Sequence, residues 1–188
     1  NLNDPVSTNQ TLGNSFNKFS VLFDRAFLKY DPKPWLSIAG GRIPNPWFGT
    51  DLVWDEDLNF EGIAASASRE FDAQYSGHVT LGAFPLQEVE LSSKDKWLFG
   101  AQGILDWDTQ ARYKTRFGLA LYEYKNVEGK ANTTPGSTLN NFTAPSFRQK
   151  GNSVFNIDAD NDPNTNLFAL ASGFRELNFT TSVTMTHF

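Results

Sequence analysis

Hydrophobic and polar residues alternate along several stretches of the chain, most clearly between Trp97 and Trp107. One face of this stretch carries Trp97, Phe99, Ala101, Gly103, Leu105 and Trp107, and the other carries Gly100, Gln102 and Asp106. Alternation over such a length predicts a β-strand with one apolar face. A tilted strand of this length rises roughly 25 Å, the height of the apolar band of an outer-membrane barrel. The pattern therefore predicts a bilayer-crossing strand, with Trp97, Trp107 and the later Tyr113 at the membrane interfaces.

Two later stretches alternate in the same way but have a more polar second face. Between residues 112 and 124, the apolar side carries Tyr113, Thr115, Phe117, Leu119 and Leu121, and the other side begins with Arg112, Lys114 and Arg116. Between residues 177 and 186, apolar positions alternate with Asn178, Thr180, Ser182 and Thr184. Such polar faces need water, which predicts the wall of a wet lumen. We expect Leu119 to face lipid and Ala120 to face an open lumen, where an arginine would be tolerated.

Alternating runs bounded by turn residues predict an all-β protein. The expected strands lie near residues 16–30, 35–43, 57–69, 76–86, 96–107, 111–125, 152–157, 166–173 and 175–187. The connection at 107–111 is tight, whereas 127–151 is long and rich in Asn, Thr, Ser, Gly and Pro. Long loops on one side and short turns on the other are typical of outer-membrane barrels. We expect one domain over residues 1–188, in a transmembrane antiparallel up-and-down β-barrel.

Composition removes several other classes of protein. No apolar run approaches the ~18 to 20 residues of a membrane-crossing helix, so any crossing must use strands. The net charge is −5, and the 16 Lys and Arg are scattered among 21 acidic residues, which argues against a nucleic-acid partner. The chain has no cysteine, which excludes a disulfide scaffold and a thiolate metal site. It starts within a polar stretch without a signal peptide, so we expect a fragment of a longer chain.

Three consecutive segments near the start carry a resemblance to a known family. They are the strand-like run at 23–30, the turn Gly-Arg-Ile-Pro-Asn-Pro-Trp at 41–47, and Leu-Val-Trp-Asp-Glu-Asp-Leu at 52–58. An Arg-Ala-aromatic-Leu strand, a Gly-Arg-x-Pro-Asn-Pro-aromatic turn and a Leu-Val-Trp-Asp-x-Asp-Leu segment follow one another in the same order in the putative porin family of Gram-negative outer membranes. The sequence resembles this family here, and by strand pattern elsewhere.

The resemblance implies a closed antiparallel barrel in the bacterial outer membrane that passes small hydrophilic solutes passively. It also implies lipid and lipopolysaccharide around the barrel, assembly as a homotrimer, and no enzymatic activity. A general porin needs roughly 16 strands, and this sequence predicts fewer. We therefore expect the chain to cover only part of a porin barrel.

Charged residues near the start and middle of the chain suggest how a pore would be lined. Arg25 and Lys29 share one face of the first strand and would join the basic ladder of Arg112, Lys114 and Arg116 in attracting anions. An acidic group, Asp51, Asp55, Glu56, Asp57 and Glu61, could face this ladder across a constriction. Alternatively, the ladder is the solvated face of a soluble sheet, and the acidic group is a hydrated turn.

Other patterns give little support to a cofactor or to catalysis. Asp158, Asp160 and Asp162 place carboxylates at every second residue, as a calcium loop does, but Pro163 stands where an EF-hand needs Gly. We therefore favour a plain turn and expect neither cofactor nor metal. No acid in the 51–61 group is marked as a proton donor, so a glycosidase is disfavoured. His78 and His187 have no ligand partners at suitable spacing, and both are interpreted as structural or interfacial residues.

Two other functions stay open at the level of sequence. The first is a soluble β-sandwich that binds carbohydrate, in which Trp47, Trp54 or Trp107 would stack on a sugar ring. The second is a structural outer-membrane barrel without an open lumen. The porin interpretation is preferred, because apolar bands, polar ladders and the family-like segments all agree with it.

Overall fold

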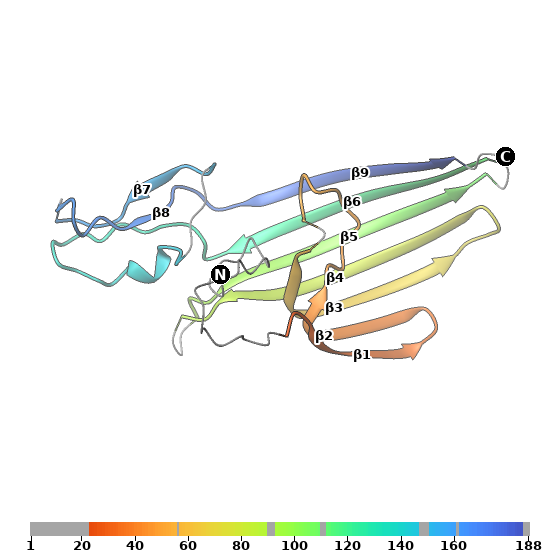
Figure 1. Cartoon of the computed structure of the whole chain (residues 1–188), viewed down its shortest axis with the longest axis horizontal. Coiled ribbons are helices and arrows are strands. Elements are labelled where there is room, and N and C mark those ends of the chain that lie inside the picture. Colours follow the sequence, from red (N-terminus) through yellow and green to blue (C-terminus); the bar gives the residue numbers. More distant parts are fainter. Residues whose placement is uncertain are drawn as a thin grey trace, which may run out of the picture.

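The computed structural model describes residues 23–55, 57–89, 93–109, 112–146, 151–160 and 162–185. Seven strands form one antiparallel sheet in the order β1-β2-β3-β4-β5-β6-β9 (Figure 1). They are β1 (Ala26–Lys33), β2 (Leu36–Pro44), β3 (Asn59–Glu70), β4 (Tyr75–Gln87), β5 (Lys96–Asp108), β6 (Tyr113–Lys125) and β9 (Arg175–Met185). This arrangement confirms the predicted all-β fold of up-and-down antiparallel strands, and the described strands do not close into a barrel. No helix in the described part of the chain is long and apolar enough to cross a membrane.

The register of the sheet brings residues of like character side by side. Leu119 of β6 pairs with Gly103 of β5 and with Phe179 of β9. On the opposite face, Arg116 pairs with Asp106 of β5 and with Ser182 of β9. Because directly paired residues share a face, one face of the sheet is apolar from strand to strand and the other is polar. We call these the outer face and the inner face.

Connections differ in length between the two ends of the sheet. The connections at one end span residues 34–35, 71–74 and 109–112, and those at the other span 45–58, 88–95 and 126–174. We call the end with the short connections the turn end, and the end with the longer connections the loop end. This confirms the unequal connections predicted from the sequence.

Two predicted strands do not join the main sheet. β7 (Val154–Asn156) and β8 (Phe168–Leu170) form a separate two-stranded sheet beyond the loop end, and Leu170 also forms an isolated parallel bridge with Glu128. The short 3-10 helix η1 (Asn141–Thr143) lies in the same region (Figure 1). Strands of three residues are too short to cross an apolar band. The segment at 126–174 instead forms a small lobe around the buried Ile157 and Ala169.

The main sheet is curved but open. Among the described residues, β1 and β9 form its two edges and do not pair with each other. The first strand begins at Ala26 instead of near residue 16, and positions 16–22 lie outside the described residues. Curvature arises where Gly41 and Gly62 pair, because both have positive φ, at 114° and 146°. A Cβ at these positions would collide with the carbonyl oxygens of Ala26 and Ala83, so only glycine fits this bend.

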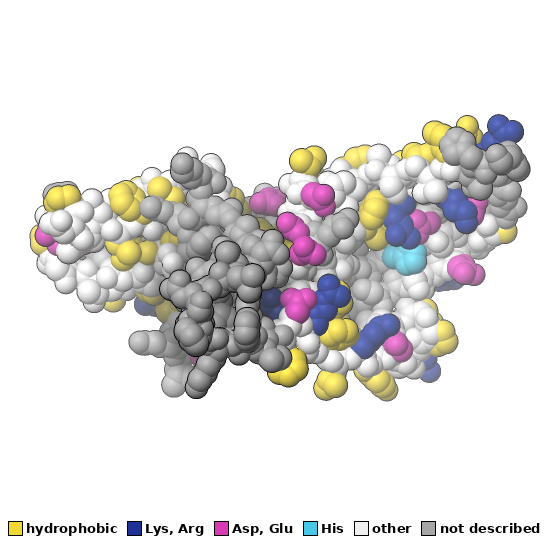
Figure 2. Space-filling model, in the orientation of Figure 1, with side chains coloured by type: hydrophobic (Ala, Val, Ile, Leu, Met, Phe, Trp, Pro, Cys, Tyr) yellow, Lys and Arg dark blue, Asp and Glu magenta, His cyan; other side chains and the backbone are white. Residues whose placement is uncertain are grey.

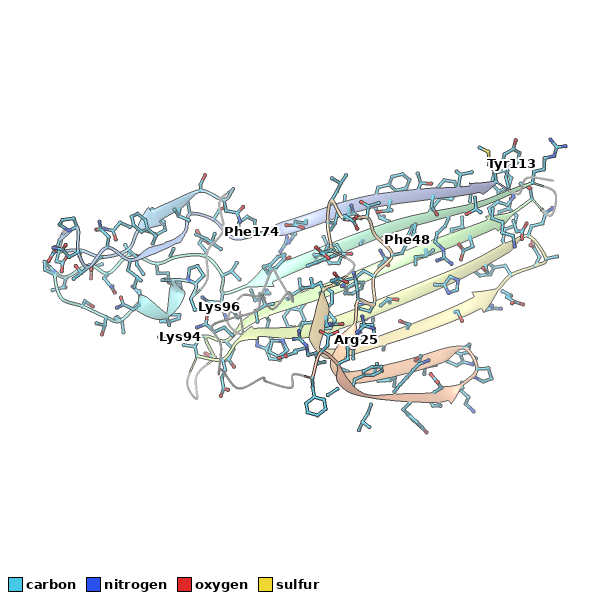
Figure 3. The ribbon with its side chains drawn as sticks, viewed as in Figure 1. Arg25, Phe48, Lys94, Lys96, Tyr113 and Phe174 are labelled. Atoms are coloured by element: carbon cyan, nitrogen blue, oxygen red, sulfur yellow. The ribbon has the colours of Figure 1, made fainter. Side chains whose placement is uncertain are left out.

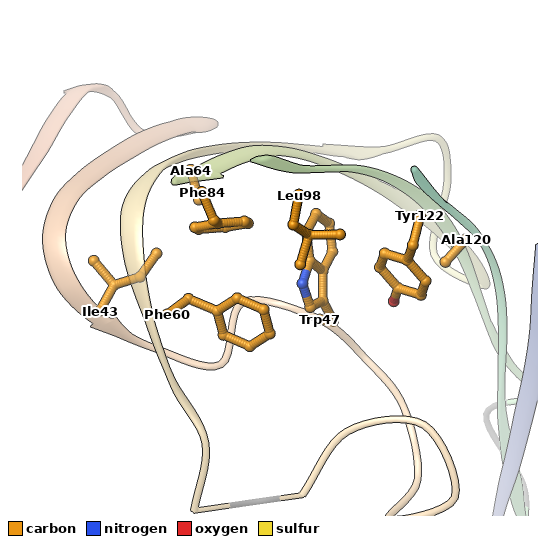
Figure 4. Close-up of a cluster of buried hydrophobic side chains, with 8 residues drawn as sticks. All are labelled: Ile43, Trp47, Phe60, Ala64, Phe84, Leu98, Ala120 and Tyr122. Carbon is orange, nitrogen blue, oxygen red and sulfur yellow. The ribbon is translucent and has the colours of Figure 1, made fainter. Parts of the chain in front are cut away.

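The main hydrophobic core lies on the inner face, between the sheet and the connection at 45–58. This connection crosses in front of the sheet (Figure 1), and the strands curve around the buried side chains beneath it (Figure 4). The core consists of Ile43, Trp47, Phe60, Ala64, Phe84, Leu98, Ala120 and Tyr122. The ring of Trp47 packs edge-on against Phe84 and Tyr122, with centroid distances of 6.1 and 5.3 Å.

Candidate pore-lining face

Apolar side chains cover the outer face and are exposed there. Leu119 is 54 % exposed, Phe179 65 % and Val183 54 %. Such a continuous apolar surface is unusual on a soluble monomer and marks contact with lipid or a partner. The alternation predicted at 97–107 is confirmed, because Phe99 and Leu105 are exposed while Gly100 and Gln102 are buried.

Aromatic side chains lie near both ends of the outer face. At the turn end, Trp107 stacks on Tyr75 with a centroid distance of 6.3 Å, and Tyr113 is exposed beside Met185. Nearer the loop end, Trp97 stacks on Phe99 with a centroid distance of 5.7 Å. Two aromatic levels that flank an apolar band are the arrangement found at membrane–water interfaces.

Polar and charged side chains gather on the inner face, and Figure 2 shows this face over the sheet. The polar residues predicted on 112–124 and 177–186 lie next to one another there, because Lys114 pairs with Thr184, Arg116 with Ser182, Gly118 with Thr180, and Ala120 with Asn178. Their exposure differs. Ser182 and Thr184 are exposed, whereas Thr180 is only 7 % exposed.

An ion-pair cluster occupies the inner face toward the turn end. The guanidinium of Arg116 donates from Nε to Oδ1 of Asp106 at 2.6 Å and from Nη2 to Oδ2 at 3.0 Å. Nε2 of His78 lies 2.9 Å from Oδ2 of the same carboxylate. At the next pair on the same face toward the turn end, Nζ of Lys114 lies 2.8 Å from Oδ2 of Asp108. Two cations of the predicted ladder are therefore each paired with a carboxylate of the neighbouring strand.

A cavity of about 640 Å³ lies beside this cluster. Its walls come from the end of β3, from the β3–β4 turn, from the turn-end halves of β4, β5, β6 and β9, and from Phe48 of the 45–58 connection. The ring of Phe48 lies over the Arg116 guanidinium, with 5.4 Å between Cζ and the ring centroid. Figure 3 shows Phe48 in front of the sheet, with Tyr113 at the far end from Lys94 and Lys96.

The backbone of Phe48 is anchored to the sheet by Gln102. The amide of Phe48 donates to Oε1 of Gln102 at 2.8 Å, and Nε2 of Gln102 donates to the Phe48 carbonyl at 2.6 Å. Gln102 is 2 % exposed, so both bonds are shielded from water. Together with the packing of Trp47, these bonds hold the 45–58 connection inside the curve of the sheet.

The first two predicted lumen cations, Arg25 and Lys29, contact residues outside the basic ladder. Arg25 precedes β1, and its Nε donates to Oδ1 of Asn59 at 2.7 Å. Lys29 lies on β1, with Nζ 3.4 Å from Oδ2 of Asp31. Arg112 lies in the β5–β6 connection, just before β6. Arg25 and Lys29 are therefore held by Asn59 and Asp31, and not by contacts with the basic ladder.

Lys114 and Arg116 of the basic ladder pair with Asp108 and Asp106 of β5, and not with the described residues of the acidic group at 51–61. Asp51, Asp55 and Asp57 are exposed on the 45–58 connection, Glu61 lies on β3 with Oε1 3.0 Å from Nη1 of Arg42, and Glu56 lies outside the described residues. Asp55 accepts a hydrogen bond from the Asp57 amide at 2.9 Å, as in a capped turn.

The aspartates at 158–162 form a chain of local turns. Oδ1 of Asp160 accepts from the amide of Asp162 at 2.8 Å, and Oδ1 of Asp162 accepts from the amide of Asn164 at 2.9 Å. Oδ1 of Asp158 lies 3.4 Å from the amide of Asp160. Within the described ranges, no group of three or more His, Cys, Asp or Glu residues is arranged to hold a metal ion. The calcium alternative gains no support from this geometry.

Sequence reasoning missed the residues that organise the inner face. His78 was interpreted as structural or interfacial, and the sequence did not indicate its contact with Asp106 in the wall of the cavity. Trp47 and Trp54 were considered as sugar platforms, but Trp47 is 6 % exposed and Trp54 packs on Phe60 at 5.1 Å. Alternation already placed Asp106 on the polar face. Its pairing with Arg116 depends on the register between β5 and β6. The sequence does not define this register, because the length of the turn between the two strands is uncertain from sequence alone.

Comparison with known proteins identifies a family. The family described as putative porin matches residues 1–188, the whole of the sequence. Comparison with curated proteins gives no significant match, and neither does comparison with solved structures. Porin families are built from antiparallel barrels and are typically non-enzymatic. A full-length family match, together with an up-and-down sheet that has one apolar and one polar face, establishes that this chain belongs to the putative porin family.

Proposed function

We propose that the chain forms the wall of an outer-membrane porin, a water-filled channel for passive diffusion of small hydrophilic solutes or ions. The observation that carries the proposal is the two-faced sheet: Leu119, Phe179 and Val183 are exposed on one face, and Arg116, Asp106 and Ser182 lie on the other. In a barrel, the first face would meet lipid and the second would meet water. Family membership supports the same function and a location in the bacterial outer membrane.

The edge strands β1 and β9 need partners if the sheet forms part of a barrel wall. An unpaired strand edge is not tolerated in lipid, because each unsatisfied backbone group costs several kcal/mol. We therefore propose that the seven strands are one section of a larger barrel, completed by further strands of a longer porin chain that pair with β1 and β9. The surroundings would be lipid and lipopolysaccharide, and assembly as a homotrimer belongs to the same proposal.

A non-conducting structural barrel is the second candidate, and one observation favours it. The 45–58 connection and the core around Trp47 fill the inner side of the sheet near the loop end. A passage would have to run beside this packed region. The carbohydrate-binding sandwich has less support, because Trp47 and Trp54 are packed into the core and Trp107 stacks on Tyr75 on the outer face.

Single-channel recording in a planar bilayer tests the proposed function. The full-length protein, extracted in detergent, is expected to produce discrete current steps in KCl. Insertion without steps would favour the structural barrel and contradict the porin. Solubility without detergent would contradict both membrane proposals and favour the soluble sandwich.

A further inference from the structure

The cavity near the turn end has an unusual balance of charge for a channel with a basic ladder. Its lining includes four carboxylates, of Glu70, Asp72, Asp106 and Asp108, and the two permanent cations Lys114 and Arg116. Both cations are already paired, Arg116 with Asp106 and Lys114 with Asp108. An anionic solute would have to compete with a carboxylate for each cation, within a region of negative net charge. The cavity therefore disfavours anions.

Both hydrogen-bond donors and hydrogen-bond acceptors line this cavity. The two bonds to Asp106 use Nε and Nη2 of Arg116, which leaves Nη1 to donate to a ligand. Carboxylate oxygens can only accept, whereas the hydroxyls of Ser182 and Thr184 can donate and accept. A ligand hydroxyl also donates and accepts, so vicinal hydroxyls match such a mixed surface better than a charged group does.

An apolar surface completes the cavity. The ring of Phe48 is held by the two hydrogen bonds between its backbone and Gln102, and its edge fits over Gly118, where a Cβ would lie 2.8 Å from Cδ1 of the ring. Small-molecule sites commonly combine an aromatic surface with a few fixed polar groups, in cavities of roughly 300 to 1,000 Å³. The volume of about 640 Å³ falls within this range.

We propose that this cavity is a binding site for neutral polyhydroxylated solutes, of the sugar and sugar-alcohol class, on the inner face of the channel. The Asp106–Arg116 pair would hydrogen-bond the hydroxyl groups, and Phe48 would cover the C–H face of the ligand. The inference rests on the proposed function insofar as the site lies along the solute's path. Binding itself does not require conduction.

Sorbitol and gluconate are suitable probes, because they share a six-carbon polyol chain and differ by one carboxylate. Saturation-transfer NMR on the full-length protein in detergent is expected to show binding of sorbitol, with an affinity about tenfold higher than that of gluconate. In planar bilayers, sorbitol is expected to reduce the single-channel current in a saturable manner. Failure of saturation transfer to sorbitol would overturn the site whether or not the protein conducts.

Asp106→Asn tests the role of the ion pair. The substitution leaves the Arg116 charge unpaired, so gluconate is expected to bind more tightly than sorbitol, which reverses the order of affinity. Glu123→Gln is the matched control, since it removes one negative charge near Arg175, at the loop end of the outer face. An unchanged order in Asp106→Asn, or the same reversal in Glu123→Gln, would contradict the proposal. Absence of current steps together with normal sorbitol binding would contradict the channel and leave the site standing.

Discussion

Adjacent residues of one strand meet different surroundings in this protein. On β6, Leu119 is 54 % exposed on the outer face, and Ala120 is 1 % exposed on the inner face. The direction of both side chains was predicted correctly from alternation. The expectation that Ala120 borders open lumen was wrong, because Ala120 belongs to the core that includes Trp47 and Tyr122. An arginine there would collide with packed side chains, so tolerance is not expected at this position.

Leu119→Arg is expected to impair insertion into a bilayer. A cation on the lipid face costs roughly 2 to 4 kcal/mol near the bilayer midplane. Ser182→Arg is the better control, because Ser182 is exposed on the inner face, where an added cation would meet water instead of lipid. The measurement is the free energy of folding into lipid vesicles, obtained by urea titration. Equal destabilisation by the two variants would contradict the assignment of the faces.

The elements differ in how far their place follows from local pattern. The wall strands follow from alternation, and their bounds agree with the structure to within a few residues from β2 to β6. The 45–58 connection was expected to be a charged turn or a constriction, but its apolar members determine its position. Trp47 and Trp54 pack against the inner face and hold the connection there, while Asp51, Asp55 and Asp57 stay exposed. Aromatic burial here outweighs the tendency of a charged loop to remain in water.

Gly100→Ala is expected to weaken the packing of the 45–58 connection against the sheet and to lower the free energy of unfolding. A Cβ at Gly100 would lie 2.5 Å from Cζ2 of Trp47, so the indole would have to move. Overpacking of this kind costs about 1 to 3 kcal/mol. Gly103→Ala adds the same methyl group to the outer face of the same strand, where nothing lies within 4 Å. Urea unfolding of both variants in vesicles is the measurement, and equal free energies of unfolding would show that Trp47 does not pack as described.

At the scale of the whole molecule, the two ends of the sheet differ. The turn end has short connections and the aromatic pair Tyr75 and Trp107. The loop end carries the lobe at 126–174. This lobe contacts β5, where Lys96 donates to the Thr143 carbonyl at 3.4 Å, and the β4–β5 connection, where Lys94 lies over the Phe142 ring. In outer-membrane barrels the longer loops face the outside of the cell. The structure therefore predicts an orientation in the membrane.

Single-cysteine labelling can measure this orientation, because these 188 residues contain no cysteine that would compete for the label. Thr138→Cys lies in the lobe and Ala73→Cys in the β3–β4 turn, and both positions are exposed. A membrane-impermeant maleimide is expected to label Thr138→Cys on intact cells. It should label Ala73→Cys only after the outer membrane is permeabilised. The opposite result would mean that the turn end faces outward.

The sequence by itself determined which side chains of the wall strands share a face. Side-chain direction in a strand has a period of two, which is a local property, so alternation was enough to assign Leu119 and Phe179 to one face and Arg116 and Ser182 to the other. The same alternation indicated the aromatic positions Trp97, Trp107 and Tyr113.

Only the tertiary structure decided which of these residues meet. The pairing of Asp106 with Arg116 depends on strand register, and the burial of Trp47 depends on a connection folding back across several strands. Both follow from contacts between segments distant in the sequence, whose relative placement no local periodicity determines. This is why the basic ladder suggested an anion-attracting wall, whereas in three dimensions Lys114 and Arg116 are paired with the carboxylates of β5.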